Sequence, residues 1–466
     1  MKTKEGKVLR FKARLVACGY SQVPGVDFEN TFAPVASLDI FKLFIAYCAA
    51  RGLTIFGFDI SNAFLHAELP ETLYCDPPKG WSGFNIKHKC WQLLRALYGT
   101  KQAGHLWNKL MVAFLLEFGF EQFELDPCLF VYRKNGEFAV LVLWVDDIAL
   151  GASSSFKERF LGALSQRFKV SEAASGQELE LFIGITVCQS ADSITLSHKH
   201  MIASEVRKLG LENAKRISTP MVGDFFKVLQ DTPSKELDKS GIEQYKHLIG
   251  VLLWIARCTR GDILFAVQNL ARFQQAPTVF LLHAVKRVFR YLNSTVDFAL
   301  VFDKDIEPVL SMMVDSDYAA DLSDCRSFSG VLASLGSAMF CAQCSKQPVT
   351  ALSTVESEFY ALCKAVKVEA FFRSALEFLM GVLAPTIVDC DSQGAIRFAL
   401  NPVSNSRVKH IRISFAYVRD ALLEGILKLR YIVSANNTAD LLTKPLGAVK
   451  QTHFCKFFFN DSSLSC

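Results

Sequence analysis

Hydrophobic and polar positions follow two different periods up to about residue 150. Apolar residues recur at helical spacing in "FKLFIAYCAARG" (41–52), which stops at a glycine, and in "LWNKLMVAFLLEFGF" (106–120). The segment "LTIFGFDI" (53–60) is rich in β-forming residues, and "PCLFVYRKNGEFAVLVLWVDD" (127–147) predicts a hairpin that turns at Asn135-Gly136. This alternation of strands and helices predicts an α/β fold.

The rest of the chain divides into a mixed, a helical and a second alternating region. Residues 155–235 mix both patterns, and residues 243–295 are helical, with "LLHAVKRVFRYL" (281–292) the clearest case. From about residue 309 the pattern restarts with strands and then alternates strand and helix to about residue 447. At about 150 residues per domain, the 466 residues predict about three units.

Two of the predicted strands end on carboxylates. The run "LVLWVDDIAL" (141–150) contains the adjacent pair Asp146 and Asp147, and the strand predicted at 53–60 carries Asp59 near its end. If the fold joins these groups, they repel one another and take up protons unless cations bind. Magnesium suits oxygen ligands, and two such ions about 4 Å apart support phosphoryl transfer. A solvated acidic turn explains the same spacing, so the pattern alone leaves both interpretations open.

Composition and charge narrow the class of protein only slightly. Apolar residues make up 51% and charged residues 21% of the chain, which is typical of a globular protein rather than a disordered one. The net charge of +5 permits a nucleic-acid partner without requiring one. The basic start lacks the apolar core of a secretory signal, and no apolar run approaches the roughly 20 residues of a membrane helix. We therefore expect an intracellular protein that is not secreted and has no membrane partner.

The cysteines give a weak signal of their own. Fourteen cysteines include one C-x-x-C pair, Cys341 and Cys344, and no second pair stands at zinc spacing. We interpret them as free thiols, with a structural zinc at this pair as the alternative.

Several motifs in a fixed order carry a family resemblance. A resemblance to the reverse transcriptase of copia-type LTR retrotransposons is carried by "FKARLVACGYSQVPGVDFENTFAPVAS" (11–37), "FDISNAFLHAELPETLY" (58–74), "LYGTKQAGHLW" (97–107) and "LWVDDIAL" (143–150). The segment that follows it in that family is similar to "ISTPM" (217–221), "YKHLIGVLLWIARCTRGDILFAV" (245–267) and "HAVKRVFRYL" (283–292). The family's ribonuclease H resembles "VDSDYAADLSDCRSFSG" (314–330), "SKQPVTALSTVESEFYAL" (345–362), "VDCDSQGAI" (388–396), "SRVKHI" (406–411) and "NNTADLLTKPL" (436–446).

The resemblance implies a polymerase of right-hand architecture followed by a ribonuclease H-like domain. The polymerase, with fingers, palm and thumb, would occupy residues 1–235, and its palm would be an α+β, ferredoxin-like fold. A connection would follow at 236–305, the ribonuclease H-like domain at 306–447 and a C-terminal tail at 448–466. The match begins after the family's first fingers strands, so we expect an N-terminally truncated fingers region.

The resemblance also implies function and partners. The expected activities are RNA-directed DNA polymerisation and cleavage of RNA in RNA–DNA hybrids. The expected partners are an RNA template, a DNA primer, their hybrid and deoxynucleoside triphosphates, and the expected place is the cytoplasm, in virus-like particles, or the nucleus. The sequence carries no signal for an oligomeric state.

The first implied site lies in the palm. By resemblance, Asp59, Asp146 and Asp147 hold two Mg²⁺ ions, for which Mn²⁺ can substitute. Phe64 matches the steric-gate position, where a ring packs against the sugar and leaves no room for a 2′-hydroxyl. With 39 phenylalanines in the chain, an ordinary core residue is the alternative.

Three further residues match positions that bind the incoming nucleotide. Gln102 matches a glutamine near the nucleotide, and Lys12 and Arg14 match fingers cations that contact the triphosphate. Charge-assisted contacts of this kind suit phosphate. Taken alone, "KAR" at 12–14 is equally a solvated basic stretch.

The second implied site has four carboxylates that would hold two more Mg²⁺ ions and activate water against an RNA phosphodiester. By resemblance these are Asp315, Glu358, Asp391 and Asp440. We interpret nearby acids as mostly solvated bystanders, namely Asp317, Asp321, Glu356 and Asp389. His410 either assists proton transfer or is structural.

Several positions depart from the family pattern. Trp144 stands where the family has tyrosine, Gly104 and His105 replace proline and arginine, Gly261 replaces proline, and Asn405 stands where the family carries an extra histidine. A bulkier ring at 144 would crowd the primer end, and glycine loosens a backbone that proline would fix. These departures leave two alternatives open: a catalytically inactive remnant that only binds nucleic acid, and a chain active only as the ribonuclease H.

Overall fold

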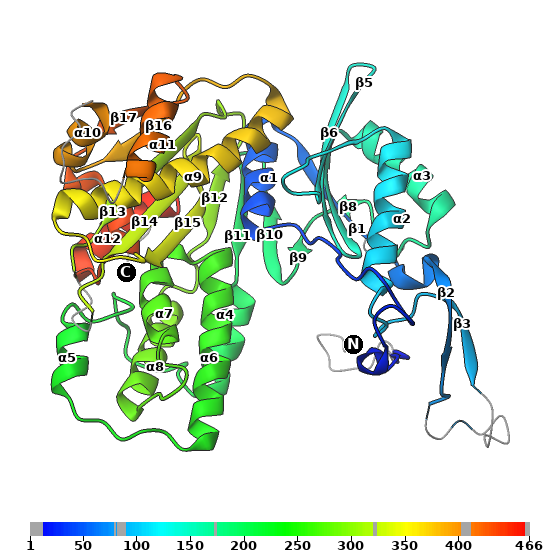
Figure 1. Cartoon of the computed structure of the whole chain (residues 1–466), viewed down its shortest axis with the longest axis horizontal. Coiled ribbons are helices and arrows are strands. Elements are labelled where there is room, and N and C mark those ends of the chain that lie inside the picture. The colour runs from blue at the N-terminus through cyan, green and yellow to red at the C-terminus, as the bar shows by residue number, and fades with distance from the viewer. Residues whose placement is uncertain are drawn as a thin grey trace. The chain divides into compact units, whose positions relative to one another are not determined.

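A computed structural model describes residues 13–78, 81, 90–171, 175–319, 324–401 and 412–461, with the backbone alone at 412–415. The chain forms two compact units (Figure 1). Unit 1 comprises Met1–Ser37 and Ile55–Glu178, and unit 2 comprises Leu38–Thr54 and Leu179–Cys466. The borders predicted at 235 and 305 do not coincide with this division, and the assignment of those domains stays a prediction. No helix among the described residues is both long and apolar enough to cross a membrane.

Unit 1 is built on a six-stranded sheet with the strand order β4-β5-β6-β7-β1-β8. Its strands are β1 (Thr54–Asp59), β4 (Glu121–Gln122), β5 (Leu129–Lys134), β6 (Glu137–Trp144), β7 (Asp147–Ala152) and β8 (Gln177–Glu178). A separate ribbon pairs β2 (Glu68–Cys75) with β3 (Trp91–Arg95). The 3₁₀ helices are η1 (Gly19–Ser21) and η2 (Ala63–His66). The central strand β6 is buried on both faces from Ala139 to Leu143, which explains its unbroken apolar run.

Two helices cover one face of this sheet, α2 (Ala103–Phe118) and α3 (Ser154–Arg167) (Figure 1). Phe160 of α3 packs edge-on against Phe58 of β1, with ring centroids 5.3 Å apart, and also contacts Phe114 of α2. The hairpin predicted at 127–147 is confirmed as β5 and β6. Its turn residues Asn135 and Gly136 have φ of 55° and 75°, the left-handed region that the Asn-Gly pair tolerates best.

Unit 2 contains two sheets. A four-stranded antiparallel sheet has the order β12-β11-β10-β9, and a five-stranded mixed sheet has the order β15-β14-β13-β16-β17. The strands are β9 (Leu181–Phe182), β10 (Ile185–Gln189), β11 (Ser193–Ser197), β12 (Leu300–Asp303), β13 (Leu310–Ser316), β14 (Phe328–Leu335), β15 (Ala338–Lys346), β16 (Thr386–Cys390) and β17 (Leu427–Tyr431). Strands β13, β16 and β17 run parallel, so the ends of β13 and β16 meet at one edge of the sheet.

The helices of unit 2 follow the predicted pattern closely. They are α1 (Leu38–Ala50), α4 (Lys199–Lys208), α5 (Phe225–Asp231), α6 (Lys239–Cys258), α7 (Leu264–Ala271), α8 (Val279–Ser294), α9 (Thr354–Met380), α10 (Gln393–Leu400), α11 (Arg412–Leu423) and α12 (Ala448–Phe458). The 3₁₀ helices are η3 (Gly261–Ile263), η5 (Ser434–Asn436) and η6 (Thr438–Leu442). The long helix α9 crosses β13 and β14, and Ser353 caps its start by accepting the N–H of Glu356 at 3.2 Å.

Helix α1 belongs to unit 2 although the segments before and after it belong to unit 1. Every residue from Ile40 to Ala50 is buried, and the helix packs on β12 and β15. Its one buried cation, Lys42, is satisfied by Asp39 at 3.1 Å and by the carbonyl oxygen of Arg257 at 3.0 Å. A helix that is apolar all round requires burial on all sides, which unit 2 provides.

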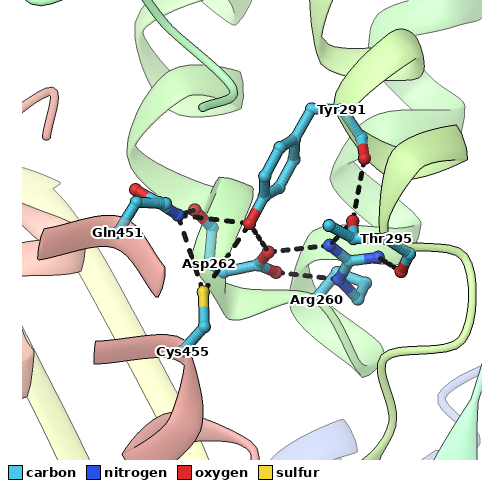
Figure 2. A network of polar contacts seen from close by, with 6 residues as sticks. All are labelled: Arg260, Asp262, Tyr291, Thr295, Gln451 and Cys455. Atoms are coloured by element: carbon cyan, nitrogen blue, oxygen red, sulfur yellow. Dashed lines mark hydrogen bonds and ion pairs between the residues drawn. The ribbon is translucent and has the colours of Figure 1, made fainter. Parts of the chain in front are cut away.

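A buried polar network joins η3, α8 and α12 (Figure 2). Arg260 is fully buried and donates from Nε and Nη2 to the two carboxylate oxygens of Asp262, at 2.9 and 2.8 Å. The hydroxyl of Tyr291 donates to Asp262 at 2.8 Å, and Gln451 of α12 donates to that hydroxyl at 3.3 Å. Because both charges have partners, this ion pair avoids the large penalty of an unpaired buried charge.

This network corrects one prediction. We expected only a tail at 448–466, but residues 448–458 form α12, whose Gln451, Phe454 and Phe458 are buried. The helical turn places these side chains on one face, which meets Tyr291 through Gln451 and Gly261 through Phe458.

Candidate active sites

Neighbouring strands bring together the three carboxylates predicted for the palm. Asp59 ends β1, and Asp146 and Asp147 lie at the turn from β6 to β7, the strand next to β1. The N–H of Ile60 donates to the carbonyl oxygen of Asp146 at 3.1 Å, which ties the two segments together. Burial, the charge of Asp146 and that of Asp59 raise the pKa of Asp147 to about 6. The three carboxylates are therefore close enough to interact electrostatically.

The turn that presents these acids has an unusual backbone. Val145 has a φ of 55°, a left-handed conformation that is rare for a β-branched residue. The indole Nε1 of Trp107, on α2, donates to the carbonyl oxygen of Val145 at 2.6 Å. Trp144 is half-buried and faces Asp147 across the β6–β7 register. The bond from Trp107 thus stabilises the left-handed conformation of Val145. Backbone strain of this kind is typical of functional sites.

Phe64 and Arg14 both pack against the ring of Tyr98, and the rings of Phe64 and Tyr98 are tilted by 49°. Phe64 lies on η2 with its ring centroid 4.6 Å from that of Tyr98, and the guanidinium of Arg14 lies 5.6 Å from the Tyr98 centroid. Burial raises the pKa of Tyr98, as do Asp146 and Asp59, while Arg14 opposes them. One ring thus links the predicted sugar-contacting residue, a predicted phosphate contact and the carboxylates. We did not single out Tyr98 from the sequence, and Lys12 lies outside the described residues.

Gln102 is held in place by its own hydrogen bonds. Its side chain is buried, accepts from Gln22 at 3.2 Å and donates to the carbonyl oxygen of Asp27 at 3.0 Å and to Glu71 at 3.2 Å. These bonds join η1, the segment after it and β2. The contact of Gln102 with a nucleotide stays a prediction.

The Gly104–His105 departure is built into local contacts. Nδ1 of His105 donates to the carbonyl oxygen of Phe32 at 2.7 Å. A Cβ at Gly104 would lie 3.4 Å from Cβ of Ala33, which is an ordinary van der Waals contact. Gly261, which replaces the family's proline, is also closely packed. A Cβ on this residue would lie 2.4 Å from the ring of Phe458.

The second predicted site assembles from four separate elements of unit 2. Asp315 lies on β13, Glu358 on α9, Asp391 directly after β16 and Asp440 on η6. Glu358, Asp391 and the thiol of Cys390 offer ligand atoms within 4.8 Å of one another. Burial raises the pKa of Glu358 to about 9, with Asp315, Asp391 and Asp440 adding to the shift. The predicted convergence of strand-end and helix-face carboxylates is therefore present in the structure.

Lys444 lies inside this group of acids, and we did not predict it. Its Nζ is 2.7 Å from Oδ1 of Asp440 and 3.5 Å from Oδ2 of Asp315. Burial and Asp315 raise the pKa of Asp440 to about 6, while Lys444 lowers it. The hydroxyl of Thr443 donates to Asp315. The sequence offered one signal for Thr443 and Lys444, which is that they follow Asp440 by three and four residues and so can lie beside it on a helical turn.

Three acids that we interpreted as solvated bystanders are instead buried. Asp389 receives two hydrogen bonds from Arg430, at 2.6 and 2.8 Å. Asp317 accepts from the N–H of Phe328, and Glu356 accepts from that of Leu352 at 3.0 Å. Their structural bonds explain the burial, because a buried carboxylate requires partners. Asp321, Asn405 and His410 lie outside the described residues.

Both groups of acids fit hard divalent cations. In unit 1, burial raises the pKa of Asp147, and the negative charges of Asp146 and Asp59 add to the shift. In unit 2, the buried Oε2 of Glu358 has no hydrogen-bond partner among the described residues. Carboxylate oxygens of this kind suit hard divalent cations, although the thiol of Cys390 also lies in the second group.

Comparison with known proteins places this geometry in a class. Residues 1–223 match the family model "Reverse transcriptase (RNA-dependent DNA polymerase)". The fold is similar to that of a foamy viral protease–reverse transcriptase solved with double-stranded DNA, with a TM-score of 0.50 and 12% identity over 88% of this chain and 61% of that one. The predicted α/β polymerase fold class is confirmed. Residues 1–223 therefore contain a reverse transcriptase domain.

Two curated relatives are similar to this chain over most of its length. The chain is 31% identical to the retrovirus-related Pol polyprotein from transposon RE1 of Arabidopsis thaliana, over 97% of this chain and 30% of the relative. It is 30% identical to that from transposon TNT 1-94 of Nicotiana tabacum, over 94% of this chain and 33% of the relative. It therefore spans about a third of the length of these relatives. The chain is thus similar to Pol polyproteins of copia-type retrotransposons over most of its own length.

Proposed function

We propose that this chain is an RNA-directed DNA polymerase that also cleaves the RNA strand of RNA–DNA hybrids. The single observation that supports this best is the presence of two separate carboxylate sites, each assembled from distant sequence segments. The match of residues 1–223 to the reverse transcriptase model supports the first activity, and the position of Asp315, Glu358, Asp391 and Asp440 supports the second. The partners would be an RNA template, a DNA primer, their hybrid and deoxynucleoside triphosphates.

In the polymerase site, Asp59, Asp146 and Asp147 would hold two divalent ions. When bound, such ions lower the pKa of the primer 3′-hydroxyl and stabilise the charge on the leaving pyrophosphate. Phe64, packed on Tyr98, would exclude a 2′-hydroxyl from the nucleotide sugar. Arg14, stacked on the same ring, would contact the triphosphate.

In the nuclease site, Asp315, Glu358, Asp391 and Asp440 would hold two divalent ions next to the scissile RNA phosphodiester. The neutral, protonated form that burial favours for Glu358 would give way to the carboxylate as the ions bind. Thr443, by donating to Asp315, would fix the orientation of that carboxylate. A hybrid would be bound mainly through its backbone and shape, and therefore in a salt-dependent manner.

The test is primer extension by the purified chain on an RNA template with a labelled DNA primer and Mg²⁺. The RNA is labelled as well, so that one reaction reports both activities. We expect Asp146→Asn to abolish extension and spare RNA cleavage, and Asp391→Asn to do the reverse.

The outcomes separate the alternatives. Loss of both activities in either single variant would contradict two independent sites. RNA cleavage without extension would leave the chain as a ribonuclease H alone. Hybrid binding with neither activity, in a chain that remains folded, would make it an inactive remnant.

A further inference from the structure

Two sequence motifs without a role in either carboxylate site meet in unit 2. Helix α8 contains "HAVKRVFRYL", and the segment before α5 contains "ISTPM". Nη2 of Arg287 donates to the hydroxyl of Thr219 at 2.9 Å, and Nη2 of Arg290 donates to the carbonyl oxygen of Lys215 at 2.9 Å. The loop 211–219 therefore lies along α8, and Asn293 and Ser294 of that helix also bond to its backbone.

This contact gathers positive charge without acids to balance it. Helix α8 contains His283, Lys286, Arg287 and Arg290 and no aspartate or glutamate. His283, Arg287 and Arg290 are spaced to share one face, opposite the buried Val285 and Phe289 face. The loop adds Lys215 and Arg216, both exposed. The loop's one acid, Glu212, is paired with Arg207 at 3.2 Å.

The two arginines are held in an arrangement that is unfavourable without an anion. Each donates one hydrogen bond to the loop, and neither forms an ion pair with an acid among the described residues. The Nε atoms of both are buried without an acceptor in that part of the chain. Burial lowers the pKa of Arg287, and the neighbouring charge of Arg290 adds to this effect. Because a guanidinium group matches the oxygens of a phosphate or carboxylate, an anion at this surface would supply the partner that the two arginines lack among the described residues.

We propose that the surface formed by Lys215, Arg216, Arg287 and Arg290, which we call the α8 basic surface, binds the phosphodiester backbone of the RNA–DNA hybrid. The inference rests on the proposed function and adds a binding site outside both carboxylate sites. Arg287 and Arg290 supply half-buried, oriented guanidinium groups, while Lys215 and Arg216 supply exposed charge. A backbone contact of this kind is independent of sequence and gains affinity from counterion release.

The experiment measures binding of a fluorescent RNA–DNA hybrid to the full chain by anisotropy, without Mg²⁺, over a series of NaCl concentrations. The main variant is Lys215→Gln with Arg216→Gln, because both residues are exposed and the bond from Arg290 reaches the backbone of Lys215, which the substitution keeps. We expect weaker binding and a salt slope that is smaller by about 1 to 2, since each phosphate contact contributes about 0.9. The control, Lys428→Gln with Lys450→Gln, removes two other exposed charges of unit 2 and leaves the slope unchanged.

Two more variants distinguish a structural role of the arginines from a role in phosphate binding. Thr219→Val removes the tether of Arg287 without changing charge, and we expect it to preserve the salt slope. Arg287→Lys keeps the positive charge but loses the planar guanidinium group. We expect its affinity for the hybrid to lie between that of the wild type and that of the double variant. An unchanged slope in the Lys215/Arg216 double variant, with normal hybrid binding by the wild-type chain, overturns this inference alone.

Two outcomes concern the ligand. If the wild-type chain binds the hybrid without any salt dependence, the proposed nucleic-acid function itself fails. If millimolar inorganic phosphate stabilises the wild-type chain against heat but not the double variant, and hybrid affinity is equal in both, the surface binds free phosphate and the backbone proposal is overturned.

Discussion

The ammonium group of Lys444 lies 2.7 Å from the carboxylate of Asp440, in the middle of the second group of acids. The same ammonium is 3.5 Å from Asp315. Burial by itself would lower the pKa of Lys444, but the two carboxylates outweigh this and raise it. Lys444 thus balances part of the negative charge of this site in the protein without metal.

Replacing Lys444 by methionine should therefore destabilise the metal-free protein. Asp315 and Asp440 would lose their counterion, and because the pair is partly exposed we expect a loss of about 1 kcal/mol. The gain in stability on adding Mg²⁺ should grow in the same variant, since fewer positive charges oppose the ions. Urea unfolding in EDTA and in Mg²⁺ measures both, with Lys428→Met as the exposed control. Equal unfolding curves for the variant and the wild type would show that Lys444 does not balance these acids.

The raised pKa of Glu358 predicts how the stability of the metal-free protein depends on pH. Burial, Asp315 and Asp391 move this pKa from 4.5 to about 9. Between these values the folded chain keeps a proton that the unfolded chain releases, so stability falls as pH rises through this range. Below about pH 4.5 both states are protonated and the contribution is fully present.

Glu358→Gln mimics the protonated form at every pH. In EDTA at pH 8 we expect the variant to melt at a higher temperature than the wild type, and at pH 4 we expect no difference. The exposed Glu424→Gln serves as the matched control. A variant that is less stable than the wild type at pH 8 would contradict the burial argument.

Phe64→Val should weaken the choice of deoxynucleotides over ribonucleotides. The ring of Phe64 is fixed on Tyr98 at 4.6 Å, so a smaller side chain leaves a gap that a 2′-hydroxyl can enter. We expect relative ribonucleotide incorporation to rise on the order of tenfold, the usual scale for a small steric change. Single-nucleotide extension with each triphosphate measures it, and the exposed neighbour Leu65→Val is the control. Unchanged selectivity would remove Phe64 from the sugar-contacting role.

Gly261→Ala should destabilise unit 2, contrary to the usual effect of this substitution in a helix. The new Cβ would lie 2.4 Å from the buried ring of Phe458, and overpacking of this kind costs about 1–3 kcal/mol. Gly250→Ala on α6 meets nothing within 4 Å and should stabilise by up to about 1 kcal/mol. Chemical unfolding compares them, and Phe458→Leu should recover part of the loss at 261. An equal effect of both alanines would contradict this account.

The sequence predicted the elements that have strong local signals. The Asn135-Gly136 turn and helices α2 and α8 follow from residue type and spacing, and each is present close to its predicted bounds. The order of the motifs predicted both groups of acids. In each case the information lies within one segment, or in a family pattern that already records which segments meet.

Contacts between distant segments were beyond reach. The place of Lys444 depends on the approach of η6 to β13, and that of Tyr98 on η2 and Arg14, which no local pattern encodes. Asp389 was misjudged for the same reason, because its partner Arg430 lies 41 residues away on the neighbouring parallel strand. The packing of α12 likewise depends on distant residues, because Gln451 bonds to Tyr291 and Phe458 lies against Gly261.

The interleaving of the two units has a consequence for chimeric genes. The chain passes from unit 1 to unit 2 before Leu38, returns after Thr54 and passes again after Glu178. A recombinant joined at codon 178 would take α1 from one parent and its packing surface on β12 and β15 from the other. Since α1 is buried throughout, mismatched parents would meet in the core of unit 2 rather than at a linker. Crossovers at this codon should therefore survive only between parents with compatible α1 sequences.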